Sequence, residues 1–375
     1  MDFKLDYLII GPAHPYRGGI ADTNHDLALG LQKQGFSVKI VSFKKLYPKG
    51  IFPGTSQFTD KKAADELQIE RKIHAFNPLQ WGNVVRYIKN LAPKHVVFRY
   101  YTPFLAPCYS YLGNRLKTAA SCIALVDNWI PHEQRPWDRW LTQKIKKTFT
   151  RFITLSSAVA EEMKKDGVEN IFKGFHPISE NLPPNLGQEQ ARIALGWDLK
   201  KPIALFYGLV RPYKGLDLLL SAFLEAPLAS ADILLAVVGE FYEPQSKYQK
   251  QLSELTEKEM LYFSPGFADE AYTQLVFCAA DIVVLPYRSA SQSGVVPLAY
   301  HYQKPLLVTD LPGLKQPIVS DGTGWVCAPN SSALSRKLTV AMNERKEKKQ
   351  QQLSQARKNY SWEKFVKWMD SVCNG

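Results

Sequence analysis

Residues 5–42 read LDYLIIGPAHPYRGGIADTNHDLALGLQKQGFSVKIVS, and the fold prediction starts from this stretch. The apolar run at residues 5–10 predicts a buried strand, which ends at the Gly- and Pro-rich loop of residues 11–19. Residues 20–34 have apolar positions at helical spacing, and residues 37–42 form a second strand-like run. Two strands joined through a helix in this way are parallel, so the stretch is a β-α-β unit.

The same alternation of strand-like and helical segments continues along most of the chain. Further short apolar runs predict strands at residues 96–98, 122–126, 152–155, 203–207, 233–238, 282–285 and 306–308. This alternation predicts an α/β protein with doubly wound parallel sheets.

Two domains are expected, because 375 residues exceed the length at which one hydrophobic core usually stays undivided. A passage rich in Pro, Gly and Asn at residues 173–185 breaks the alternation and resembles a linker. We therefore predict an N-terminal domain at residues 1–185 and a C-terminal domain at residues 186–355. Residues 356–375 are predicted to contain a terminal helix, capped by Ser361, that crosses back to the N-terminal domain.

The composition is that of a globular protein with a basic surface. Hydrophobic residues make up 45% of the chain and charged residues 22%, which excludes collagen-like and disordered chains. The net charge is +12, and residues 1–190 hold 26 Lys and Arg against 17 Asp and Glu, which is +9 of that total. Such a balance suits contact with anions such as lipid head groups or phosphorylated carriers, although an ordinary basic surface is the alternative. No recognised nucleic-acid-binding motif is present, so no nucleic-acid partner is expected.

The sequence also bears on location. The first residues carry acids and lack a signal-peptide cleavage site, and no stretch approaches the roughly 18 apolar residues that span a bilayer. The five cysteines are widely spaced, with neither a C-x-x-C pair nor metal-ligand spacing. We therefore expect a cytoplasmic protein with reduced thiols, with peripheral contact to the inner face of the membrane left open.

Residues 206–217 read FYGLVRPYKGLD and carry the strongest functional signal. A strand leads into a turn at Gly208, and the turn presents Arg211 and Lys214 immediately before a helix. Ligands of open α/β sheets bind at the carboxyl ends of strands, and two cations there suit a diphosphate. The alternative is that both residues are ordinary surface cations.

This segment resembles the donor-site loop of the GT-B glycosyltransferases, in particular the retaining family 4, also called glycosyl transferases group 1. The resemblance implies two Rossmann-like doubly wound domains facing each other across a cleft, with a nucleotide diphosphate sugar as donor and a second sugar-bearing molecule as acceptor. It implies retention of the anomeric configuration, the leaving diphosphate helping to deprotonate the acceptor. It also implies that no metal or other cofactor is needed, because Arg211 and Lys214 neutralise the leaving diphosphate.

Further segments resemble the same family in the same order along the chain. Residues 237–240 (VVGE) are similar to a strand end that places Glu240 at the donor, and residues 263–270 (FSPGFADE) to the loop that brings Phe267 to the nucleotide base. Similar segments follow at residues 281–286, 304–310 and 322–326. Each match is weak alone, and their order makes the resemblance specific.

The family's sugar and phosphate cradle corresponds to residues 291–299, SQSGVVPLA. Gly294 matches the family's glycine, which lets neighbouring backbone N–H groups approach phosphate or sugar. The family's two glutamates are absent, because Ser291 and Ala299 occupy their positions. Either a subgroup holds its donor with hydroxyl, amide and backbone groups, or the site is degenerate. The predicted donor contacts in this segment are Ser291, Ser293, Gly294 and Val295.

In the N-terminal domain, Gly18 and Gly19 resemble the family's glycine loop, which closes over the donor phosphate and the acceptor. A pair of glycines before a helix suits such an approach, although many α/β proteins have glycines after their first strand. The loop does not match G-x-G-x-x-G, which disfavours a dinucleotide-dependent oxidoreductase.

A polar cluster follows the apolar run at residues 122–126. Many family members have a functional histidine at this strand end, and here the position corresponds to Asp127, with His132 five residues on. Either side chain could orient an acceptor hydroxyl or accept its proton, so both are candidate catalytic residues beside Arg211 and Lys214. The alternative is loop hydrogen bonding and capping.

Residues 135–149 combine cations, tryptophans and aliphatic side chains. A basic amphipathic helix of this kind can lie on an anionic membrane, or it can pack on the sheet with a basic outer face. Binding of this helix to a membrane would suit a lipid-linked sugar as acceptor.

The sequence therefore predicts a glycosyltransferase of surface polysaccharide or lipopolysaccharide biosynthesis. Two alternatives remain: a catalytically degenerate GT-B binding partner, which the changes at Ser291 and Ala299 motivate, and a GT-B nucleotide-sugar epimerase.

Overall fold

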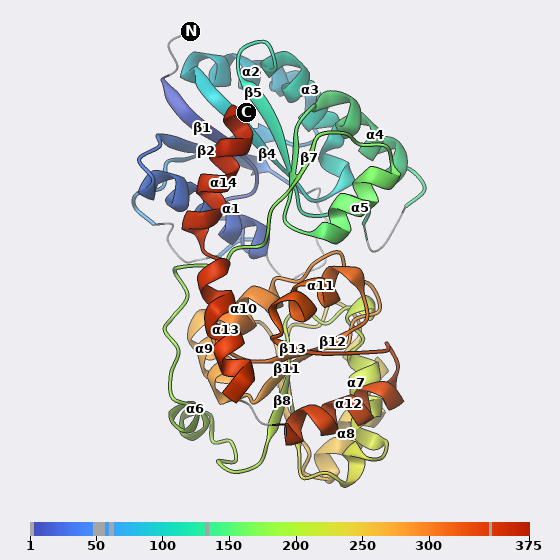
Figure 1. Cartoon of the computed structure of the whole chain (residues 1–375). Helices are drawn as coiled ribbons and strands as arrows, with labels where there is room; N and C mark the ends of the chain where they lie inside the picture. Colours follow the sequence, from blue (N-terminus) through green and yellow to red (C-terminus); the bar gives the residue numbers. More distant parts are fainter. Residues whose placement is uncertain (1–3, 48–56, 60–63, 132–134, 345–346) are drawn as a thin grey trace. The chain divides into compact units, whose positions relative to one another are not determined.

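The computed structural model describes residues 4–47, 57–59, 64–131, 135–344 and 347–375 (Figure 1). The chain divides into two compact units, one of Met1–Glu180 with Ser361–Gly375 and one of Asn181–Tyr360. The divisions fall after residues 180 and 360, whereas the predicted ones fall after residues 185 and 355. Each unit is an α/β structure built on one parallel sheet, as the strand pattern predicted.

The first unit contains a seven-stranded sheet in the order β3-β2-β1-β4-β5-β6-β7, in which every paired strand is parallel. The order reverses between β1 and β4, as in a doubly wound fold. The central strands are buried along most of their length because helices cover both faces. The strands are β1 (Leu5–Ile10), β2 (Val38–Lys45), β3 (Ile69–His74), β4 (Pro93–Tyr100), β5 (Ser121–Val126), β6 (Phe152–Thr154) and β7 (Ile171–Lys173).

Two hydrophobic cores lie on the two faces of this sheet, because successive strand side chains point to opposite sides. The larger core joins the sheet to α2 (Pro78–Leu91), α3 (Ala106–Leu116), α4 (Asp138–Thr148) and α5 (Ser157–Lys165). The other core joins the opposite face to α1 (Gly19–Lys33) and α14 (Trp362–Asn374). Figure 1 shows α14, in red, beside α1 on that face.

Helix α14 is part of the first unit although it follows the whole second unit in sequence. Ser361 caps it, as predicted, by accepting a hydrogen bond from the Lys364 N–H. A Cβ atom at Gly30 of α1 would come within 3.2 Å of the Val366 side chain, and one at Gly174 within 2.6 Å of Trp368. Both glycines therefore permit the close approach of α14.

The second unit contains a six-stranded parallel sheet in the order β10-β9-β8-β11-β12-β13. This order reverses between β8 and β11, which repeats the doubly wound arrangement of the first unit. The strands are β8 (Ile203–Tyr207), β9 (Leu234–Gly239), β10 (Leu261–Pro265), β11 (Ile282–Leu285), β12 (Leu306–Thr309) and β13 (Gly324–Cys327).

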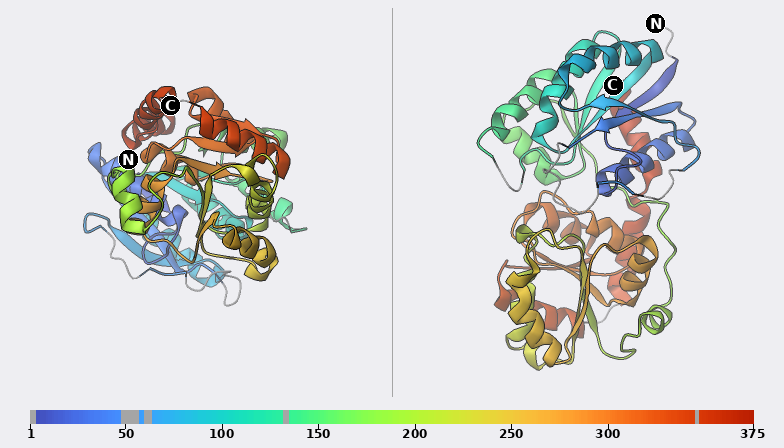
Figure 2. Two further views of the ribbon diagram at one scale, coloured as in Figure 1. Left: turned by 90° about the horizontal axis from the view of Figure 1, so that it is seen from below. Right: turned by 180° about the vertical axis from the view of Figure 1, so that it is seen from behind.

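Helices cover both faces of this sheet as well (Figure 2). Phe206 of β8 belongs to the core with α7 (Leu216–Leu224), α8 (Gln249–Glu257) and α12 (Ser331–Asn343). The next residue, Tyr207, points to the opposite face, where its ring meets Phe277 of α9 (Glu270–Ala279). The remaining helices of this unit are α6 (Gln188–Leu195), α10 (Val295–His301), α11 (Pro312–Asp321) and α13 (Glu347–Asn359). Four short 3-10 helices complete the described helices: η1 (Pro103–Leu105), η2 (Pro212–Lys214), η3 (Leu228–Ser230) and η4 (Gln245–Tyr248).

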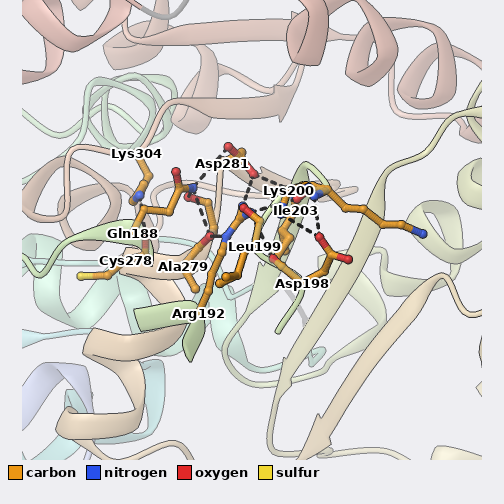
Figure 3. Close-up of polar contacts among 12 residues, drawn as sticks. Gln188, Arg192, Asp198, Leu199, Lys200, Ile203, Cys278, Ala279, Asp281 and Lys304 are labelled. Atoms are coloured by element: carbon orange, nitrogen blue, oxygen red, sulfur yellow. Dashed lines mark hydrogen bonds and ion pairs between the residues drawn. The ribbon is translucent and has the colours of Figure 1, made fainter. Parts of the chain in front are cut away.

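A buried ion pair holds α6 to the amino edge of the second sheet (Figure 3). Arg192 Nη2 lies 2.6 Å from Asp281 Oδ2, and the two side chains are only 4% and 9% exposed. Asp281 also accepts the Ile203 N–H at 2.7 Å, directly at the start of β8. Hydrogen bonds from Arg192 to backbone carbonyls, including that of Ala279, satisfy the rest of the guanidinium. The charges are paired and hydrogen-bonded, which is what a structural role requires of buried ions.

Candidate functional site

The loops predicted to bind the donor lie at the carboxyl edge of the second sheet. Gly208 to Lys214 follow β8, and Ser291 to Val295 follow β11, so the two segments flank the point where the strand order reverses. Crevices at such a reversal are where open α/β sheets bind ligands. Because all strands are parallel, Glu240 after β9 and Phe267 after β10 lie at the same edge.

Lys214 lies at the end of η2 and reaches back over Gly208. A Cβ atom at Gly208 would lie 3.3 Å from Lys214 Nζ and 4.0 Å from a Val295 methyl group, so these three predicted residues come together. Gly208 has a φ of 105°, which a side chain rarely adopts. Glycine at this position therefore leaves the room that the lysine occupies.

The Lys214 ammonium group is only partly exposed and forms no ion pair with any carboxylate of the described residues. Its described partner is the Tyr287 ring, whose centroid is 5.5 Å from Nζ. Burial lowers the pKa of Lys214, the neighbouring Tyr213 opposes this shift and the Arg211 guanidinium adds to it. A partly desolvated cation without an anionic partner favours binding of an anion.

Arg211 precedes η2, and its guanidinium lies over the ring of Tyr242 at 5.1 Å from the centroid. The backbone brings the loop after β9 beside it, because the Val210 N–H donates to the Glu240 carbonyl at 2.8 Å. Arg211, Lys214 and Glu240 are thus placed by adjacent segments, and their binding of a donor stays a prediction.

Ser293 organises the segment before α10. Its hydroxyl lies 3.3 Å from the Tyr287 hydroxyl and accepts the Val295 N–H at 3.3 Å. A Cβ atom at Gly294 would meet nothing within 4 Å, so open space lies above this glycine. Tyr287 therefore connects Lys214, which contacts its ring, with Ser293, which contacts its hydroxyl.

Ser291 and Ala299, the positions at which the family resemblance would place glutamates, are packed inside the unit. Ser291 is 2% exposed, and Ala299 on α10 is fully buried. Gly313 of α11 packs so closely on the backbone of Ser291 that a Cβ atom there would come within 2.4 Å. Phe267 differs from both, since its side chain is 63% exposed.

In the first unit, Gly18 and Gly19 begin α1 at the carboxyl edge of the sheet. Gly18 has a φ of 108°, and a Cβ atom at either glycine would meet nothing within 4 Å. The preceding loop is held by His25, whose Nε2 accepts the His14 N–H at 2.9 Å. Burial, with a smaller effect of His14, lowers the pKa of His25 to about 4, so this ring is neutral and can accept.

Asp127 follows β5 and is 1% exposed. Arg99 of β4, equally buried, donates from Nε and Nη2 to its two carboxylate oxygens, with an Nη2–Oδ1 distance of 2.7 Å. Arg99 also donates to the Thr23 hydroxyl in the first turn of α1 at 3.1 Å. The structure thus gives Asp127 an ion-pairing role, and its role as a proton acceptor stays a prediction. His132, the other candidate beside it, lies outside the described residues.

His176 was not among the predicted site residues, because the sequence places it in the passage interpreted as a linker. It follows β7 and is partly buried, and the charges of Arg99 and Asp127 both act on its ring. The structure therefore adds a histidine to the polar residues at the carboxyl edge of the first sheet.

Within the described ranges, no three or more His, Cys, Asp or Glu side chains are grouped so that they could hold a metal ion. No helix of the described residues is both long enough and apolar enough to cross a membrane.

Comparison with known proteins identifies the family. Residues 187–360 match the family described as "Glycosyl transferases group 1". The second unit of the chain therefore contains a glycosyltransferase domain of this family. The chain's two doubly wound units form the GT-B fold, which solved structures share over the whole chain. HepE of Anabaena, solved in complex with UDP and glucose, superposes with a TM-score of 0.74 at 13% identity, covering 98% of this chain and 99% of HepE. WaaG, a glycosyltransferase involved in lipopolysaccharide biosynthesis, superposes with a TM-score of 0.64 at 15% identity, covering 98% and 100%.

One curated protein to which the chain is similar is a GDP-mannose:glycolipid 4-beta-D-mannosyltransferase of Xanthomonas campestris pv. campestris. The two are 24% identical over 230 residues, which cover 58% of this chain and 59% of the relative. The match thus spans little more than half of either protein.

Proposed function

We propose that this protein transfers a sugar from a nucleotide diphosphate donor to a saccharide or lipid-linked acceptor, in the synthesis of a surface polysaccharide or lipopolysaccharide. The observation that carries the proposal is Lys214, a partly buried cation without a carboxylate partner among the described residues, at the strand reversal of the second sheet. With Arg211 it supplies two charges to a diphosphate, and charge stabilisation of this kind lowers the barrier to its departure.

The names of the relatives support the substrate classes. The curated relative uses GDP-mannose and a glycolipid, and HepE was solved with UDP and glucose. Open space above Gly294 and the exposed ring of Phe267 leave room for phosphate and base at this edge. The nucleotide base and the sugar of the donor are therefore the first properties to determine.

Nucleotide-dependent thermal stabilisation tests the donor site. We expect one of UDP, GDP and ADP to raise the Tm of the wild type, since a ligand that binds only the folded state stabilises it. The effect should disappear in the double variant Arg211→Ala, Lys214→Ala. The control Lys247→Ala, Lys258→Ala removes the same charge from exposed positions of the same unit and should respond like the wild type. Lack of any shift at millimolar nucleotide would contradict the proposal.

The degenerate-partner alternative predicts binding without turnover. It is motivated by Ser291 and Ala299, which replace carboxylates at positions that are buried here. Release of nucleotide diphosphate from a sugar donor, with a new glycosidic product, separates a transferase from a binding partner and from an epimerase.

Three finer expectations accompany the proposal. Retention of configuration rests on the family resemblance alone, and the product of the wild type tests it. The absence of a metal requirement follows from the two cations, and a chelator tests it. Peripheral binding to an anionic membrane is supported by Trp137 and Trp140, whose side chains are 56% and 63% exposed at the start of α4.

A further inference from the structure

Tyr287 lies in the loop that follows β11, and its side chain is only 2% exposed. Its backbone carbonyl accepts a hydrogen bond from the Thr309 hydroxyl at the end of β12, at 2.6 Å. Burial raises the pKa of Tyr287 to about 12, although the hydrogen bond with Ser293 opposes this shift. The ring is therefore a fixed and uncharged surface at neutral pH.

The residues that flank this tyrosine contact the residues that flank Lys214. On one side, the Arg288 N–H donates to the Tyr213 carbonyl at 2.7 Å. On the other side, Gly215 packs so closely that a Cβ atom there would come within 2.1 Å of the Pro286 carbonyl oxygen. The loop after β8 and the loop after β11 are thus joined by their backbones on both sides of the lysine. The position of the ring relative to the lysine is therefore set by the fold of the second unit.

The ring holds the lysine by a cation–π contact. Lys214 Nζ lies 5.5 Å from the centroid of the Tyr287 ring, within the roughly 6 Å over which a ring attracts an ammonium group. This attraction offsets only part of the penalty of burial, which still lowers the pKa of Lys214. A carboxylate in the same place would neutralise the ammonium group, whereas the uncharged ring leaves its full charge available to a bound anion.

We propose that Tyr287 is a positioning residue of the donor site, whose ring holds the Lys214 ammonium group without neutralising it, so that the ammonium group meets the donor diphosphate. This inference rests on the proposed function. Tyr287 acts through Lys214, and the role does not require it to touch the donor. The role belongs to the ring, so the Tyr287 hydroxyl, which lies 3.3 Å from the Ser293 hydroxyl, is dispensable for it.

The experiment measures the affinities of the full-length protein for UDP, UMP, GDP and GMP by titration calorimetry. We expect the wild type to bind the diphosphate of its preferred base at least about 10-fold more tightly than the monophosphate, since the second phosphate adds charge-assisted contacts. Tyr287→Leu should lower this preference about 3- to 10-fold, as expected for the loss of one cation–π contact. Tyr287→Phe, which keeps the ring, should retain the preference within about twofold.

The pH dependence of this preference shows whether the tyrosine acts through the lysine. Burial lowers the pKa of Lys214, Tyr213 opposes this shift and the Arg211 guanidinium adds to it. The preference for diphosphate should fall as the pH rises through this pKa, because the ammonium group loses its charge. Removing the ring takes away a contact that favours the charged form and so lowers the pKa further. The fall should therefore begin at a lower pH in Tyr287→Leu than in the wild type and Tyr287→Phe.

The control is Tyr302→Leu, which removes another buried tyrosine of the second unit, one whose ring contacts Phe277. It should lower the Tm as Tyr287→Leu does, while leaving the preference for diphosphate and its pH dependence unchanged. If Tyr287→Leu does not fold, Tyr287→Met takes its place, since methionine adapts to irregular apolar spaces.

Two kinds of result would count against the proposal. An unchanged preference or an unshifted pH dependence in the non-aromatic variant, or an equal loss of preference in Tyr287→Phe, would overturn it. If the wild type bound no nucleotide diphosphate, or bound it no more tightly than the monophosphate, the proposed function would fail first, and the role of Tyr287 with it.

Discussion

Lys214 carries a positive charge in an environment that does not stabilise it in the ligand-free protein. Its ammonium group is desolvated, and within the described residues no carboxylate pairs with it. A lysine whose pKa is lowered by folding destabilises the folded state most at pH values below that lowered pKa, and the cost shrinks as the pH rises from it toward the unfolded-state pKa. The site thus holds a charge that a bound anion would stabilise.

We therefore expect Lys214→Met to raise the Tm of the ligand-free protein at pH 7 and to abolish stabilisation by nucleotide. Each kcal/mol gained corresponds to roughly 2–4 °C for a unit of this size. Scanning calorimetry at pH 7 and pH 10 measures the effect, which should shrink at the higher pH. A ligand-free variant less stable than the wild type at pH 7 would show that the ammonium group is stabilised by contacts within the protein.

Asp127 and Arg99 present the opposite case, a buried pair in which each charge depends on the other. Asp127→Ala should lower the free energy of unfolding by about 3–5 kcal/mol, because it leaves the guanidinium buried and unpaired. The double variant Arg99→Met, Asp127→Leu should recover most of this loss. Urea unfolding measures both, and Glu161→Ala, which breaks an exposed and solvent-screened pair, serves as the control with a much smaller change. Equal loss in the single and double variants would contradict this account.

At the scale of elements, the sequence predicted the central strands and missed the edge strands. The strands β1, β4 and β8 each contain an apolar run because helices bury both their faces. The strands that were not predicted, β3, β7, β10 and β13, all lie at sheet edges and are only partly buried. The sequences of β3, β7 and β10 mix polar and apolar residues, and β13 is a run of only four residues. The spacing of apolar residues along the sequence does not identify an edge strand, because such a strand is only partly covered by the adjacent strand and helices.

The residues of the candidate site also differ in whether the sequence alone could reveal them. Gly208, Arg211 and Lys214 could be predicted because one short segment holds a strand end, a glycine turn and two cations. His176 could not, since it acquires its surroundings from Arg99 and Asp127, which are distant in sequence and reach it only through the strand order. The Pro- and Gly-rich composition around it indicated a linker and nothing more.

Helix α4 leads to a prediction about surfaces. It exposes Trp140, with Lys144 stacked on the indole at 4.3 Å from the ring centroid, and Trp137 directly before its first turn. Trp137→Ala with Trp140→Ala should reduce cosedimentation with vesicles that contain anionic lipid at least about fivefold, because interfacial binding scales with the apolar area inserted. The variant Ile193→Ala, Leu199→Ala removes exposed apolar side chains from the second unit and should bind like the wild type. No wild-type binding to anionic vesicles would refute membrane contact through α4.

At the scale of the whole molecule, the proposed chemistry relies on side-chain cations rather than on a metal ion. EDTA at millimolar concentration should leave both nucleotide stabilisation and nucleotide release unchanged, because Arg211 and Lys214 carry the charge that a cation would otherwise supply. Parallel assays with added Mg²⁺ and Mn²⁺ complete the measurement. A loss of activity in EDTA that either ion restores would show that the two side chains are insufficient.

The placement of α14 makes the first unit dependent on residues far along the chain. Without residues 361–375, the face of the sheet that carries Tyr7, Ile9 and Ile40 would lose the apolar partners it shares with α1. Deletion of these residues should therefore increase amide hydrogen exchange throughout β1, β2 and β4 while leaving β8 and β9 protected. Uniform loss of protection in both units would mean that they do not unfold separately.

The same placement determines the order in which the protein can mature on the ribosome. Synthesis proceeds from the amino end, so residues 181–360 emerge complete and can fold while the first unit still lacks its closing helix. The portion translated first is thus the portion finished last. Until α14 is released, an apolar sheet face remains open to chaperones and to other nascent chains.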